Sequence, residues 1–201
     1  MGFITELWIP ILVSAVAAWI VQAIVWTVMP HRKKEWRKVG DDDAFKAAIR
    51  GFNLEPGYYM FPWCDDPSKA KDAEFHKKMN EPPLGTLHLW AGRRSMGACM
   101  AWSFVFNLAA SVSVAYLAWE ALERPGVDYL KVFQITGAAA FLAYTFALIP
   151  GGIWFGKPIK SMAYDVADGL AVALLTGGIF GWLWPAAQAA TDAVPGAAPS
   201  P

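Results

Sequence analysis

Two carboxylates near the start of the last apolar stretch, Asp165 and Asp168, are the residues that could most readily do chemistry in this sequence. A carboxylate within a membrane-spanning segment is costly, so by default it suggests a function. The pair could relay protons or cations, or form ion pairs with Lys157 or Lys160. If the helix begins near residue 165, both would instead cap free backbone N–H groups. The capping role is the favoured interpretation.

An aromatic run in the first half of the chain is the second candidate site. It comprises Tyr58, Tyr59, Phe61 and Trp63. Aromatic residues are enriched in the cores of protein interfaces, so the run could be an interaction patch. It could equally supply core and turn residues to a small domain, and the sequence does not separate the two.

A basic cluster directly follows the first apolar stretch. Its members are Arg32, Lys33, Lys34, Arg37 and Lys38. These cations could contact anionic lipid headgroups at about 1 kcal/mol each. The favoured interpretation, however, is that the cluster only determines which side of the membrane this part of the chain occupies.

Small residues recur every four positions in the last apolar stretch, at Gly169, Ala173, Gly177 and Gly181. Such a row lets another helix approach closely, and packing within one bundle is favoured over contact with a second subunit. A few polar residues could add hydrogen bonds between spans, worth about 0.6 kcal/mol each. These are Gln22, Asn107, Ser111, Ser113 and Gln134.

The sequence carries no motif typical of an enzyme, a nucleotide site or a metal site. Cys64 and Cys99 lack the CxxC spacing, and Cys64 with Asp65, Asp66 and His76 matches no known zinc-ligand pattern. The formal net charge is zero, which does not favour nucleic-acid binding. We therefore expect no catalytic residue, cofactor or metal, and an enzyme is the less favoured class.

Four apolar stretches are long enough to cross a bilayer. They cover residues 7–29, 96–119, 132–149 and 166–184, and Pro10, Pro150 and Pro185 lie at their edges. Tryptophan, with eleven copies in 201 residues, gathers near several of these edges, as it does at membrane interfaces. The predicted fold is an all-α membrane protein, a bundle of four transmembrane helices with a small α+β domain between the first and second.

Lysine and arginine predict the orientation of the bundle. Four crossings place the cluster at 31–38, Arg93, Arg94, Lys157 and Lys160 on one side, and leave only Arg124 and Lys131 on the other. The basic side faces the cytoplasm by the positive-inside rule, so both termini are expected on the non-cytoplasmic side.

We expect a first span over residues 1–29, a cytoplasmic domain over 30–95, three further spans over 96–185 and a tail over 186–201. Within the cytoplasmic domain, acidic residues at 41–43 begin a helix over 44–52, two strands cover 58–61 and 86–90, and a polar helix covers 67–79. The tail is rich in alanine and proline and is predicted to be disordered.

Three segments resemble those of an uncharacterised family of small bacterial inner-membrane proteins. They are residues 53–63, residues 154–170 with Trp154-Phe155-Gly156-Lys157-Pro158 at their start, and residues 181–185, Gly181-Trp182-Leu183-Trp184-Pro185. The resemblance implies a bacterial inner-membrane location and no activity.

Three classes of function follow. The favoured one is an integral membrane accessory, assembly or scaffold protein that contacts the lipid bilayer and a protein partner or a second copy of itself. The first alternative is a small oligomeric transporter or channel that uses Asp165 and Asp168. The second is a membrane-embedded enzyme that acts on lipid.

Overall fold

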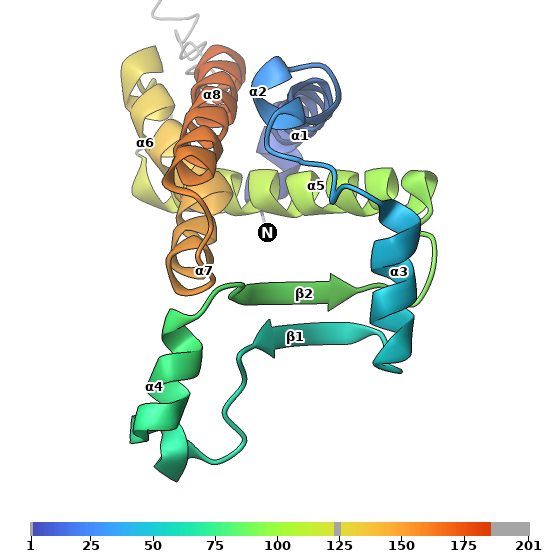
Figure 1. Ribbon diagram of the computed structural model, residues 1–201. Helices are drawn as coiled ribbons and strands as arrows, with labels where there is room; N and C mark the ends of the chain where they lie inside the picture. Colours follow the sequence, from blue (N-terminus) through green and yellow to red (C-terminus); the bar gives the residue numbers. More distant parts are fainter. Residues whose placement is uncertain (1, 123–125, 186–201) are drawn as a thin grey trace, which may run out of the picture.

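Four long apolar helices dominate the computed structural model, which describes residues 2–122 and 126–185 (Figure 1). The helices long and apolar enough to span a membrane are α1 (Gly2–Thr27), α5 (Met96–Ala121), the interrupted helix Tyr129–Trp154 and α8 (Ile159–Leu183). The four predicted spans are confirmed on length and composition. The tail predicted over 186–201 lies outside the described residues.

The third span is not a single α-helix. It consists of α6 (Tyr129–Phe141), a π-helical turn η2 (Leu142–Phe146) and α7 (Leu148–Trp154). Pro150 was expected to end this span, but α7 continues through it. Because a proline ring clashes with the carbonyl four residues earlier, here that of Phe146, the turn of helix before it has to depart from α-helical geometry.

The bundle core lies where α1, α5, α6 and α8 meet. Small side chains let these helices approach, and fully buried Leu7, Val114, Val132 and Phe180 fill the space between them. Ser14 of α1 and Ser111 of α5 share a hydrogen bond of 2.5 Å in this core. The apolar side chains on the outer surfaces of the helices remain exposed, as expected where lipid covers them.

Between α1 and α5 the chain forms a small set of elements that we name the αβ segment, residues 41–90. It contains α3 (Asp42–Gly51), β1 (Gly57–Phe61), the 3-10 turn η1 (Pro67–Lys71), α4 (Ala73–Asn80) and β2 (Gly85–Leu89). The side chain of Asp41 accepts hydrogen bonds from the N–H groups of Asp43 and Ala44, so the predicted helix start is confirmed. The polar helix predicted over 67–79 is instead divided into η1 and α4.

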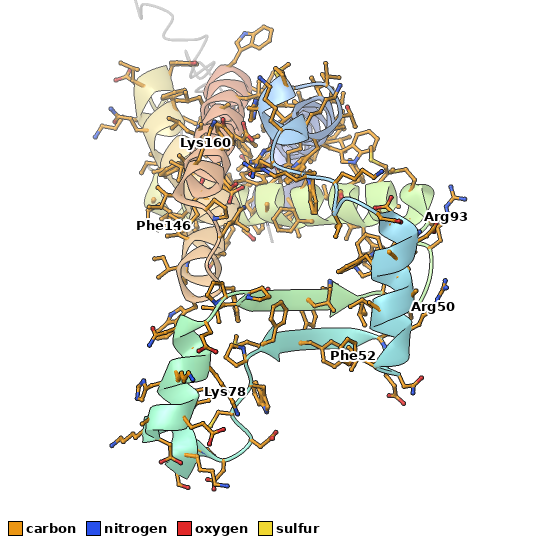
Figure 2. The ribbon with its side chains drawn as sticks, in the orientation of Figure 1. Arg50, Phe52, Lys78, Arg93, Phe146 and Lys160 are labelled. Carbon is orange, nitrogen blue, oxygen red and sulfur yellow. The ribbon has the colours of Figure 1, made fainter. Side chains whose placement is uncertain are left out.

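The two predicted strands form an antiparallel pair in which Tyr58 faces His88 and Tyr59 faces Leu87. In Figure 1, α3 stands at one end of this pair and α4 near the other. Side chains project from both faces of the strands, and Phe52 lies beside β1 at the end of α3 (Figure 2). No residue from 33 to 106 is buried. The αβ segment is therefore ordered without a core of its own.

Candidate functional site

A short turn after the first span brings a basic residue back to the bundle. Pro30 occupies the first position of α2 (Pro30–Lys33), where its missing N–H does no harm and its fixed φ favours a helix start. This four-residue helix directs Arg32 toward α8, where its side chain is only 3% exposed. Arg32 was predicted to contact lipid headgroups with the other cations of its cluster, but the burial of its side chain contradicts that prediction.

The Arg32 guanidinium binds three carboxylates. Its Nε and Nη2 atoms lie 2.7 and 2.6 Å from one oxygen of Asp168. Its Nη1 lies 3.0 Å from Asp165 and 2.9 Å from Glu35. The indole ring of Trp26 covers the cation, with the Cζ atom 4.5 Å from the ring centroid. A planar guanidinium with five donors suits this arrangement, since one lysine ammonium could not reach three carboxylates in these directions.

Two further basic residues complete what we name the Arg32 cluster: His31, Arg32, Glu35, Lys157, Asp165 and Asp168. Lys157, from the loop between α7 and α8, pairs with the second oxygen of Asp165. The Nε2 atom of His31 lies 3.2 Å from Asp168. The cluster therefore ties the end of α1, the α7–α8 loop and the second and third turns of α8 together.

The capping interpretation of the two aspartates is wrong. Helix α8 begins at Ile159, so Asp165 is its seventh residue, and the helix start has no side-chain cap. An ion pair with Lys157 was one of the alternatives, whereas the pairing with Arg32 was not foreseen. The feature of the sequence that could have indicated this pairing is Pro30, because it turns the chain back toward the bundle directly before Arg32.

Charge is nearly balanced inside the cluster. The two fixed cations, Arg32 and Lys157, face three carboxylates, and His31 adds a third positive charge only when protonated. Burial alone would lower the pKa of Arg32, but the hydrogen bonds to Glu35, Asp165 and Asp168 outweigh burial and raise it. Burial likewise opposes ionisation of Glu35, yet hydrogen bonds from Ser161 and Arg32 leave its pKa lowered.

The lowered pKa of Glu35 predicts a pH dependence of stability. A carboxylate with a depressed folded-state pKa stabilises the fold above its unfolded value of 4.5, and that contribution is lost as the pH falls through the folded-state value. We expect Glu35→Gln to cost about 1.5 kcal/mol at neutral pH, and the gap to the native protein to close in acid. Unfolding curves in detergent across that pH range measure it. A gap that stayed constant in acid would contradict the assignment.

A cleft of about 330 Å³ opens beside the cluster, between α1, α5, η2 and α8. Arg32, Asp165 and Asp168 line one part of it, and the rest is mostly apolar and aromatic. Gln22 and Tyr144 also line it and belong to a polar network between helices. In that network, Asn107 donates to Gln22 at 3.0 Å and accepts from the Tyr144 hydroxyl at 3.0 Å.

The polar residues of the spans fall into two groups. Gln22, Asn107 and Ser111 bond between helices, as predicted. The hydroxyl of Ser113 instead donates to the carbonyl of Ala109 in its own helix, and Gln134 is exposed.

The row of small residues on α8 packs against the third span of the same chain. A Cβ atom added to Gly177 would lie 2.9 Å from the carbonyl oxygen of Phe133, and one added to Gly181 would lie 2.7 Å from the Tyr129 ring. One added to Gly169 would meet Thr145 of η2. Ala173 is buried in the same interface. This internal packing is the favoured alternative of the sequence analysis.

The predicted aromatic patch lies on and after β1, in the αβ segment, and is not part of the Arg32 cluster. Tyr58 is 83% exposed and stacks on His88 at 4.0 Å, and Trp63 is 68% exposed. Phe61 is also exposed, while Tyr59 is half-buried and donates its hydroxyl proton to the Glu55 carbonyl. The four residues are therefore not the core of a folded domain.

The basic residues other than Arg32 remain at the surface. Lys33, Lys34, Arg37 and Lys38 are all exposed. Among residues 2–122 and 126–185, no three His, Cys, Asp or Glu side chains are placed to hold a metal ion. Cys64 and Cys99 are free thiols.

Comparison with known proteins gives no relative: no protein-family model, no curated protein and no solved structure matches this chain.

Proposed function

We propose that this protein is a membrane-anchored docking protein, an accessory or scaffold subunit whose αβ segment binds a partner protein. One observation carries the proposal: no residue between Arg32 and Asn107 is buried, although the segment between them is ordered and rich in large apolar side chains. Ordering a chain costs conformational entropy, which the burial of apolar side chains normally offsets. Because this segment has no core, contact with another protein surface would supply that burial.

The exposed side chains of the αβ segment have the composition of an interface core. Tyr58, Met60 and Trp63 are exposed on and after β1, and Phe45 and Phe52 are exposed on and after α3. Aromatic residues and methionine are enriched at the centres of protein interfaces. A two-stranded sheet is marginal alone, so contact with a partner would stabilise it.

The bundle supports the proposal because contacts between its helices would let it anchor the αβ segment to the membrane. The Arg32 cluster ties three parts of the chain together on the side from which the αβ segment emerges, and serine and asparagine contacts tie α1 to α5. Positive-inside orientation would present the αβ segment to the cytoplasm.

Site-specific photocrosslinking in intact membranes tests the proposal. A photoreactive amino acid at Tyr58 should crosslink to one defined protein, whereas the same amino acid at Lys78, exposed on the polar helix α4, should not. Replacing Tyr58 and Trp63 with serine should remove the complex, while Lys77→Ser and Lys78→Ser keep it. A lone protomer with equal crosslinking at both positions would count against docking.

A second candidate is transport of a small cation. The cleft beside Asp165 and Asp168 favours it, since its volume of about 330 Å³ is within the range of small-molecule pockets. Arg32 would then act as the gate that pairs with the carboxylates in the closed state. Asp165→Asn and Asp168→Asn should abolish ion flux in proteoliposomes; if the native protein carries no flux, this candidate fails.

A further inference from the structure

A second cleft, of about 480 Å³, lies between the chain after α2 and the first turns of α8. Lys34 and Arg37 line one wall, and Lys160, Ser161 and Tyr164 line the other. Lys160 lies on the first turn of α8 (Figure 2). We name it the basic cleft.

The three cations of the basic cleft have no counter-ion. Lys34, Arg37 and Lys160 form no ion pair with any residue in the described parts of the chain. The one carboxylate in the lining, Glu35, is already bound by Arg32 at 2.9 Å. Three like charges around one hollow repel each other, and an anion bound there would relieve the repulsion.

The surroundings of the cleft contain further features that suit an anion. The Lys160 ammonium lies 5.8 Å from the centroid of the Tyr164 ring, which holds it at the cleft wall. The same ring contacts His31, with ring centroids 5.0 Å apart. The first turn of α8 has no side-chain cap, although the N–H group of Ser161 donates to the carbonyl of Pro158.

The position of the cleft identifies the class of anion. The adjoining spans end here, α1 at Thr27 and the third span at Trp154, and α8 begins at Ile159. Trp36 and Trp154 are 79% and 82% exposed, as expected for tryptophans at the headgroup level. We propose that the basic cleft binds the phosphate of an anionic phospholipid headgroup in the leaflet next to the αβ segment.

The proposal differs from a diffuse attraction between a basic cluster and a membrane. Lys33 and Lys38 belong to the same cluster in sequence but do not line the cleft. A built site depends on which lysine is removed, whereas a diffuse attraction depends only on how many are removed. Each cation near a headgroup contributes about fivefold to binding, so three contribute roughly a hundredfold.

Native mass spectrometry of the detergent-solubilised full chain provides the test, with short-chain phosphatidylglycerol and phosphatidylcholine as probes. The native protein should retain phosphatidylglycerol at least about tenfold better than phosphatidylcholine. The triple variant Lys34→Gln, Arg37→Gln, Lys160→Gln should lose this preference. The matched control Lys33→Gln, Lys38→Gln, Lys46→Gln makes the same change in charge at exposed residues that do not line the cleft, Lys46 being on α3, and should keep it.

Three results would overturn the proposal. The native protein could show no preference, the control variant could lose the preference as fully as the triple variant, or inorganic phosphate could displace the lipid completely, which would identify a soluble phosphate as the ligand. Lys160→Gln alone provides a second variant in case the triple variant does not fold, and it should weaken phosphatidylglycerol retention about fivefold.

Discussion

Replacing Arg32 with methionine should destabilise the bundle by about 3–5 kcal/mol, more than the loss of any other single charge in the chain. The cost comes mainly from the negatively charged partners that are left behind, rather than from the loss of one hydrogen bond. Without the guanidinium, Glu35 loses its cationic partner, Asp168 loses its main one, and Asp165, 5% exposed, keeps only Lys157. Removing a partner from buried carboxylates costs far more than breaking an exposed ion pair.

Unfolding in mixed detergent micelles, followed by tryptophan fluorescence, measures this effect. Arg37→Met removes the same charge from an exposed site and should change the free energy of unfolding by no more than about 0.5 kcal/mol. Arg32→Lys should rescue only part of the loss, since an ammonium lacks the planar fork that reaches three carboxylates.

A double-mutant cycle separates the cluster from a general effect of substitution. Asp168→Asn removes one of the carboxylates that Arg32 neutralises, so the two changes together should cost less than the sum of the single changes. Strict additivity, or a native-like melting of Arg32→Met, would show that the Arg32 cluster does not stabilise the fold.

The spans could be predicted from the sequence because their cause is local. About twenty apolar residues in a row are enough to identify a helix that crosses lipid, whatever the rest of the chain does. Two features of the third span could not be predicted in this way. A π-helical turn and a helix that continues through Pro150 depend on how that helix meets its neighbours, and hydropathy does not register either.

The candidate site could be predicted only in part. Asp165 and Asp168 stood out because carboxylates are rare near a span, but their partner lies 133 and 136 residues earlier in the chain. Arg32 and Arg37 look alike in sequence, as members of one basic cluster. Only the turn at Pro30 and the place of α8 make the first a buried ligand of carboxylates and the second a surface cation.

The absence of buried side chains in the αβ segment could not be predicted from the sequence either. Its helices and strands follow local patterns and were largely foreseen, yet the same aromatic residues fit either a small core or an interface. Which of the two applies depends on whether the elements pack on one another. They do not bury a single side chain between residues 33 and 106, and this is the observation that directs the proposed function toward docking.

Gly177→Ala should disrupt the packing of α8 on α6 and lower the free energy of unfolding by about 1–3 kcal/mol. The added methyl carbon would lie 2.9 Å from the Phe133 carbonyl oxygen and 3.2 Å from the Cα atom of Gly137. Both are backbone atoms of α6, so no side-chain rotation can relieve the contact and the two helices must move apart. The free energy of unfolding in mixed micelles is again the measurement.

The neighbouring glycine is a matched control on the same helix. A Cβ atom at Gly178 would meet nothing closer than the Tyr129 hydroxyl oxygen, at 3.7 Å. Because alanine is the better helix former by about 1 kcal/mol, Gly178→Ala should leave stability unchanged or raise it. Gly181→Ala should fall between the two, since the ring it meets belongs to Tyr129, which is 49% exposed and can turn away. Equal effects at Gly177 and Gly178 would mean that α6 and α8 are not packed backbone to backbone, and the row of small residues would then need another partner.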